Sequence, residues 1–88
     1  IQELNASELN VARKLKTLVR KYKFKKSKEG EGKRWHIGVI AQDIEDAFTA
    51  EGLDAFEYGM ICKDEQADGS FIYSVRYNEI FAFIIAVL

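Results

Sequence analysis

The stretch that decides the fold runs Arg34-Trp35-His36-Ile37-Gly38-Val39-Ile40-Ala41-Gln42-Asp43-Ile44-Glu45-Asp46-Ala47-Phe48. It begins with a strand-like apolar segment, passes one glycine and then carries apolar residues at helical spacing. Polar and acidic side chains fill the other face of this second half. The stretch therefore predicts a strand followed by an amphipathic helix, which Gly52 is placed to end.

Two segments downstream are rich in aromatic and β-branched residues, Tyr58–Cys62 and Phe71–Tyr77. The polar residues between them include the turn signal Asp68-Gly69, so the two segments predict an antiparallel hairpin. Residues 77–88 open with Asn78 as an expected N-cap and are apolar on every side. A helix without a polar face packs centrally or against other chains.

The segment upstream of the stretch predicts a helix and then a short strand. Asn5 and Glu8 have the spacing of a capping box at a helix start. Apolar residues then follow at helical spacing, and near residue 22 the pattern changes to alternation, which predicts a strand pairing with residues 34–39 across an exposed turn at 28–32. The expected helical stripe consists of Val11, Ala12, Leu15, Leu18, Val19 and Tyr22.

These elements predict an α+β fold for residues 1–88 as a single domain: two β-hairpins, two packing helices and an apolar C-terminal helix for trimerisation. A chain of 88 residues buries only roughly 60% of its surface, so partners would add stability. We also expect that this sequence is a fragment, with a segment preceding it and a continuation of the last helix following it.

Charge is divided unevenly along the chain. Residues 1–34 hold eleven of the 13 Lys and Arg against four acids, whereas residues 35–88 hold two bases against ten acids. The halves are therefore about +7 and −8. This division fits halves that face each other, within one chain or between neighbouring copies, and it also fits a nucleic-acid-binding arm.

The residues provide no recognisable catalytic or metal-binding set. His36 is the single histidine, Cys62 is the single cysteine, and neither has the companions that a zinc site needs. The acids near Asp43 are explained as a helix face, and the serines have no nucleophile-elbow context. We expect no cofactor and no metal. The longest apolar run is about half of the ~20 residues that a membrane-spanning helix needs, so we expect no membrane segment.

Three features follow one another along the chain: the run from Arg34 to Glu45, a variable acidic hairpin, and then Tyr73–Ile80 leading into an apolar helix. In this order they resemble the C-terminal intramolecular chaperone domain of endosialidases and other bacteriophage tail spikes and fibres, the peptidase S74 family. The resemblance covers nearly the whole chain in order. One departure is that Phe48 is followed by Thr49, where the family usually has proline. The residues that carry the family motif are His36, Ile37, Gly38, Ile40, Ala41, Gln42, Asp43 and Tyr77.

The resemblance implies a homotrimeric chaperone that assists folding of the preceding shaft of the same polypeptide and is then released by self-cleavage. The family cleaves with a serine and a lysine that would lie ahead of Ile1, so no catalytic position is assigned and this fragment is expected to be inactive as a protease. The implied location is the host cytoplasm during phage assembly, as part of a tail fibre or spike precursor. The expected trimer interface is Ile80, Phe81, Ile84, Ile85 and Leu88.

A competing hypothesis is a nucleic-acid-binding module that uses the basic N-terminal half. Its affinity would fall steeply with salt, because lysines that neutralise phosphates release counterions. We consider nucleic acid the less favoured partner, because the basic segment carries an apolar stripe. The lysines concerned are Lys14, Lys21, Lys23, Lys25, Lys26 and Lys28.

Overall fold

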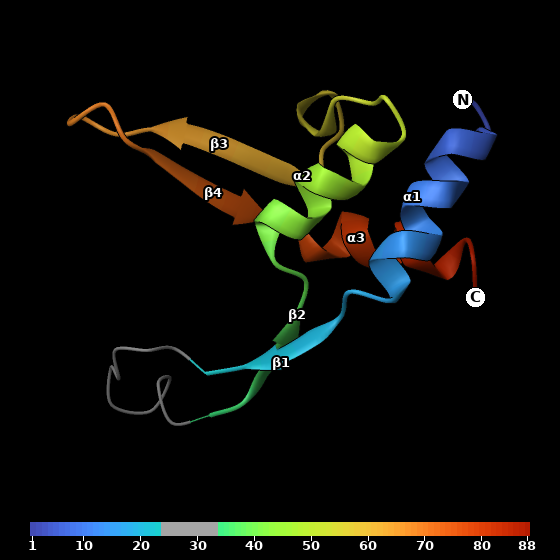
Figure 1. The fold of residues 1–88 in the computed structure, drawn as a ribbon, viewed down its shortest axis with the longest axis horizontal. Helices are drawn as coiled ribbons and strands as arrows, with labels where there is room; N and C mark the ends of the chain where they lie inside the picture. The colour runs from blue at the N-terminus through green and yellow to red at the C-terminus, as the bar shows by residue number, and fades with distance from the viewer. Residues whose placement is uncertain (24–33) are drawn as a thin grey trace.

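The computed structural model describes residues 1–23 and 34–88. Figure 1 shows the α-helices gathered at one end of the molecule, with the strand pairs extending from them. This arrangement confirms the predicted α+β class with two antiparallel hairpins. In chain order the elements are α1 (Ala6–Lys16), β1 (Arg20–Tyr22), β2 (His36–Gly38), α2 (Ala41–Ala50), the 3₁₀ helix η2 (Ala55–Glu57), β3 (Ile61–Glu65), β4 (Phe71–Val75) and α3 (Tyr77–Ile85).

Helix α1 begins at the predicted capping box. The Asn5 side chain accepts from the Glu8 amide at 2.9 Å, and the Glu8 carboxylate accepts from the Asn5 amide at 2.8 Å. The helix ends at Lys16, where the Thr17 hydroxyl donates to the Lys14 carbonyl at 2.7 Å. The predicted stripe is therefore too long, because Leu18, Val19 and Tyr22 lie beyond the helix.

Strands β1 and β2 form the first antiparallel pair, as predicted, with Tyr22 opposite His36 and Arg20 opposite Gly38. Strand β2 is shorter than expected, since it occupies only the middle of residues 34–39. Phe24 and the predicted turn at 28–32 lie outside the described residues.

Helix α2 buries Ile44, Ala47 and Phe48, which are three of the apolar residues expected on its inner face. Gly52 ends the helix as predicted: its φ is 73°, and the following amide, of Leu53, donates to the Phe48 carbonyl at 2.9 Å. This geometry favours glycine because other residues are strained at positive φ.

Strand β3 of the second hairpin is displaced along the sequence from its predicted position, whereas β4 begins at Phe71 as predicted. Asp54 caps η2 by accepting from the Phe56 amide at 2.9 Å, and Tyr58 is the C-cap of this short helix. Tyr58 therefore lies ahead of β3. Asp64 and Glu65, expected in the connection, are the last residues of β3 instead. The Asp68-Gly69 turn is confirmed, with Gly69 at φ 85°.

Helix α3 begins two residues earlier than predicted, at Tyr77, with Arg76 as its N-cap. The Arg76 carbonyl accepts from the amides of Glu79 and Ile80 at 3.1 and 3.2 Å, while the Arg76 amide donates to the Met60 carbonyl at 2.8 Å. The prediction of Asn78 as the N-cap is therefore wrong, because the bond to Met60 turns the chain at Arg76 and Asn78 already lies inside the helix.

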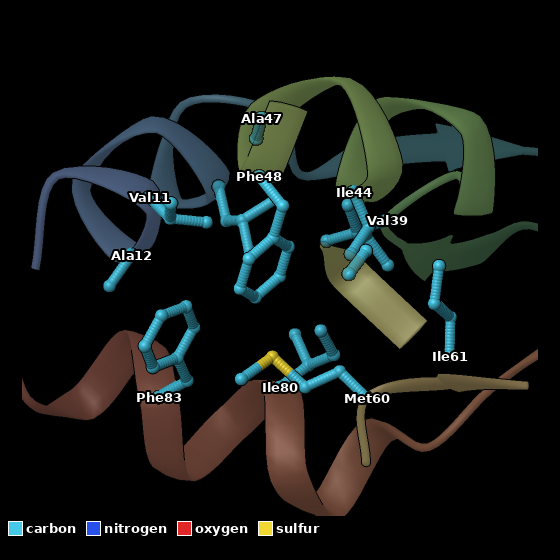
Figure 2. Close-up of a cluster of buried hydrophobic side chains, with 12 residues drawn as sticks. Val11, Ala12, Val39, Ile44, Ala47, Phe48, Met60, Ile61, Ile80 and Phe83 are labelled. Carbon is cyan, nitrogen blue, oxygen red and sulfur yellow. The ribbon is translucent and has the colours of Figure 1, made fainter. Parts of the chain in front are cut away.

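The core lies between α3 and the pair formed by α1 and α2. Figure 2 shows Ile80 and Phe83 of α3 pointing toward side chains of α1 and α2 from the opposite side. The Phe48 ring is central, with its centroid 4.7 Å from Tyr58 and 6.0 Å from Phe83. Each large side chain buried in this way contributes about 1.5–3 kcal/mol. The buried set is Val11, Ala12, Leu15, Val39, Ile44, Ala47, Phe48, Ala55, Met60, Ile61, Ile80 and Phe83.

Among the described residues, the structure contains no helix with the length and apolar character needed to cross a membrane.

Candidate functional site

Helix α3 has two apolar faces with different surroundings. Ile80 and Phe83 are buried in the core, whereas Phe81 and Ile85 on the other face are 55% and 64% exposed. Large apolar side chains side by side at the surface mark interaction sites when they form a continuous patch. The outer face of α3 is therefore the first candidate for a functional surface.

This outer face forms one wall of a groove of about 460 Å³, which we call the apolar groove. The first hairpin supplies the other wall, where Ile37 of β2 is 73% exposed. The lining consists of Val19, Ile37, Gly38, Val39, Tyr77, Ile80, Phe81, Ile84 and Ile85. Because none of these side chains is charged, the groove suits an apolar partner surface.

The two walls meet where Tyr77 packs on Gly38. A Cβ atom at position 38 would collide with the Tyr77 hydroxyl and would lie 3.0 Å from Cζ and 3.1 Å from Cε1. Any larger residue at position 38 would force the Tyr77 ring to move. Gly38 and Tyr77, both in the family-like motif, thus have a structural role: they fix β2 against α3.

Tyr77 is held further by its hydroxyl, which donates to the Val39 carbonyl across a long 3.4 Å. Burial raises the pKa of Tyr77, and the neighbouring Tyr22 phenol adds to this through its charge and its hydrogen bond. The ring also lies 5.8 Å from the Phe81 ring. Tyr77 therefore stays neutral near neutral pH and belongs to the base of the groove.

The five predicted trimer-interface residues do not share one environment. Ile80 is fully buried inside the chain, so it supports the groove from beneath. Ile84 is half-buried against the core, while Phe81, Ile85 and Leu88 are exposed. Sequence periodicity missed Val19 and Ile37 as groove residues, since it places Val19 on the helical stripe and Ile37 on a strand of unknown orientation.

Apart from Tyr77 of α3, the motif residues divide into two groups. His36 is half-buried with its ring stacked 5.7 Å from Tyr22, and it lies on the same hairpin as Ile37 and Gly38. The others lie at the start of α2, where Gln42 donates to Asp46 at 2.9 Å. Ile40 is the exposed N-cap, and Ala41 and Asp43 are half-buried. This part of the motif thus joins the first hairpin to α2.

One carboxylate fixes the start of α1 to the core. Besides accepting from Asn5, Glu8 accepts from the Tyr58 hydroxyl at 2.6 Å. This bond raises the pKa of Tyr58 to about 12, and it is also the main reason that the pKa of Glu8 is lowered. Nothing in the sequence spacing links residues 50 positions apart, so the sequence could not predict this pair.

The described lysines of the nucleic-acid hypothesis occupy two places. Lys14 lines a groove between α1 and α2 together with Asp43 and Asp46, which places it beside acids. Lys21 and Lys23 lie on the first hairpin near Trp35. Lys25, Lys26 and Lys28 fall outside the described part of the chain. Within that part, no cluster of His, Cys, Asp and Glu could hold a metal ion.

Comparison with known proteins identifies the family. Residues 1–53, more than half of the chain, match the family Peptidase_S74, described as chaperone of endosialidase. The chain belongs to the endosialidase chaperone family. The groove and the Gly38–Tyr77 contact are therefore features of a chaperone domain, and the role of this domain is in folding.

Relatives of this chaperone domain include phage tail spike proteins. A probable tail spike protein of Klebsiella phage 0507-KN2-1 is 44% identical over 64 residues, which is 69% of this chain and 5% of that protein. The tail spike protein of Escherichia virus K5 is 37% identical over 68 residues, covering 60% of this chain and 11% of that protein. The chain thus spans only a small part of these relatives.

Two solved structures are similar to the chaperone domain over 99% of its length. A novel intramolecular chaperon has a TM-score of 0.81 and 33% identity, with 87% of that chain covered. The C-terminal domain of the bacteriophage T5 L-shaped tail fibre, solved with its intramolecular chaperone domain, also has a TM-score of 0.81, at 22% identity and 26% coverage. The fold is therefore that of intramolecular chaperone domains of the kind attached to phage tail proteins.

Proposed function

We propose that residues 1–88 form one chaperone domain that drives folding and homotrimerisation of a phage tail spike or fibre precursor in the host cytoplasm. Its partners are two further copies of itself and the upstream shaft of the same polypeptide. After folding, self-cleavage at a serine ahead of Ile1 releases the domain. The apolar groove is the observation that carries this proposal.

The groove supports assembly because it leaves Phe81 and Ile85 exposed beside Ile37. Covering such side chains gains about 25 cal/mol for each Å² of apolar surface removed from water. Assembly then stabilises the folded chain by mass action. Identical copies are the natural occupants, since each copy of a tail protein brings one such domain to the same particle.

Trimerisation would help the shaft through effective concentration. Once three chaperone domains associate, their attached shaft segments become tethered neighbours, so pairing between chains no longer depends on diffusion. Shafts built from strands of different chains fold slowly, because many long-range contacts must form before any of them stabilises the structure. The domain would act before the shaft closes and becomes dispensable afterwards.

Self-cleavage would require residues that precede this chain. The domain contributes the folded C-terminal side of the junction, with Glu8 holding the start of α1 against Tyr58. No residue between Ile1 and Leu88 is assigned a catalytic role. An extended chain that contains the upstream serine and lysine is expected to split after folding; if it folds and stays intact, the proteolytic part of the proposal is wrong.

The experiment fuses a tail spike shaft from a related phage to the N-terminus of this domain and measures the yield of trimeric shaft by native gel and mass. Ile85→Asp places a charge in the groove and is expected to reduce the trimeric yield about tenfold or more, because an apolar interface does not accommodate an unpaired charge.

Ile40→Asp is the matched control, since Ile40 is also about half exposed, lies outside the groove, and occupies an N-cap where aspartate is favourable. It is expected to leave the yield unchanged. Equal yields from wild type and Ile85→Asp would contradict the proposed role of the groove.

A further inference from the structure

The two strand pairs carry opposite charge. The described part of the first hairpin, which we call the basic arm (residues 20–23 and 34–38), holds Arg20, Lys21, Lys23 and Arg34 and no acid. The second, which we call the acidic hairpin (residues 61–75), holds Asp64, Glu65 and Asp68 against a single lysine. The charge division of the sequence is thus concentrated on two projecting elements.

One face of the basic arm combines lysines with exposed apolar surface. The register places Lys21 opposite Ile37, and the alternation of strands continues this face to Lys23 and Trp35. The ammonium groups of Lys21 and Lys23 both lie 4.6 Å from the centroid of the Trp35 ring. Trp35 is 58% exposed, so the face offers positive charge around an apolar centre.

The acidic hairpin has the complementary character. Asp64 pairs with Ile72, and Glu65 pairs with Phe71, so each acid lies opposite an exposed apolar side chain. Because successive strand residues point to opposite faces, the two acids make both faces of the hairpin's outer end acidic. The ammonium of Lys63 lies 4.2 Å from the centroid of the Phe71 ring. The outer end of the hairpin, which also includes Asp68, therefore remains negatively charged.

The arm and the hairpin do not meet within one chain. Figure 1 shows β1 and β2 leaving the helices in one direction and β3 and β4 leaving them in another. The complementary surfaces can come together only between copies. Ile37 belongs both to the arm face and to the apolar groove, so a partner seated in the groove lies next to the arm.

We propose that the basic arm of one copy docks on the acidic hairpin of the next copy. This contact is heterologous, because two different surfaces of the same chain meet, and heterologous contacts close into rings such as a trimer. Charge pairing then fixes which way round the copies assemble. The inference rests on the proposed function and adds to it the surfaces that orient the copies.

The test uses charge reversal in the complete chain, with assembly measured by sedimentation equilibrium. One double variant reverses the arm (Lys21→Glu with Lys23→Glu), and another reverses the hairpin (Asp64→Lys with Glu65→Lys). Each is expected to raise the dissociation constant of assembly about tenfold or more at low salt. All four changes in one chain are expected to restore assembly to within about threefold of wild type, because every arm again faces an oppositely charged hairpin.

Raising the salt concentration should bring the dissociation constants of the variants closer to that of wild type, since salt screens exposed charges at the edge of an interface. Glu3→Lys with Glu45→Lys is the control, because it changes net charge as much as the hairpin reversal but lies outside both surfaces; it is expected to leave assembly unchanged. Circular dichroism checks that each variant is folded.

The proposal is overturned if the four-fold variant stays dissociated, or if the control dissociates as strongly as the hairpin reversal. It is also overturned if the reversals leave assembly intact while the arm reversal abolishes binding of a single-stranded oligonucleotide, which would assign the arm to nucleic acid. If Ile85→Asp dissociates the trimer but the charge reversals do not, the proposed function stands. In that case only the docking of the basic arm on the acidic hairpin is rejected.

Discussion

The inner and outer faces of helix α3 are equally apolar in sequence and have different roles. Ile80 and Phe83 on the inner face are buried, while Phe81 and Ile85 on the outer face remain exposed. The inner face holds the chain together by closing the core against Phe48. The outer face is not covered by the core, and together with β2 it forms the apolar groove. The difference shows that an apolar sequence predicts burial of a side chain, but not whether the same chain or a partner chain buries it.

The largest effect is expected when the inner face is damaged. Phe83→Ala should cost about 3–5 kcal/mol of unfolding free energy, because it leaves a cavity beside Phe48, whereas Phe81→Ala should cost less than about 1 kcal/mol. Both are measured by urea unfolding in an Ile85→Asp background, which keeps assembly from contributing to stability. Equal losses of unfolding free energy at the two positions would contradict the difference in role between the two faces.

A smaller effect is expected where the two walls of the groove meet. Gly38→Ala should destabilise the chain by about 1–3 kcal/mol, because the new methyl group overlaps the Tyr77 phenol. Adding Tyr77→Phe removes the hydroxyl that is closest to the new Cβ, so the double variant should recover part of the loss. Additive losses in the double variant would argue that the Gly38–Tyr77 contact does not limit the substitution.

The smallest effect is expected at the Glu8–Tyr58 bond, which stabilises the inner core without touching the groove. Tyr58→Phe should cost roughly 0.5–1.5 kcal/mol near neutral pH. Thermal unfolding of wild type and variant across pH measures this contribution, and assembly should be unaffected.

The pH dependence of that bond follows from the two pKa directions. The pKa of Glu8 is lowered from 4.5, so its contribution is present above that value and is lost as pH falls through the folded pKa. The pKa of Tyr58 is raised from 10.0 to about 12, so its contribution is complete below pH 10 and is lost as pH rises through 12. A wild-type profile that runs parallel to the Tyr58→Phe profile at both extremes would contradict this pairing.

Local signals in the sequence predicted the ends of elements well. The Asn5–Glu8 capping box, the Gly52 end of α2 and the Asp68-Gly69 turn are all confirmed, because each depends on backbone chemistry within a few residues. The N-cap of α3 was misplaced because Arg76, bonded to Met60, starts that helix through a contact distant in sequence. Periodicity extended α1 too far because it does not register the Thr17 cap.

The candidate site was only partly predictable. The apolar character of residues 80–85 indicated a surface for other chains, and the prediction included Phe81 and Ile85. Periodicity could not separate these from Ile80, which the core buries, because the helix has no polar face to orient it. Val19 and Ile37 became part of the groove through the pairing of β1 with β2 and the closeness of Gly38 to Tyr77, which are tertiary contacts.

The most direct test of the central claim is the solution mass of the purified domain by light scattering at micromolar concentration, for wild type and for Ile85→Asp. Trimerisation through the apolar groove predicts three times the chain mass for wild type and the mass of one folded chain for Ile85→Asp. A wild-type domain that is a stable monomer, or an Ile85→Asp variant that remains a trimer, would contradict it.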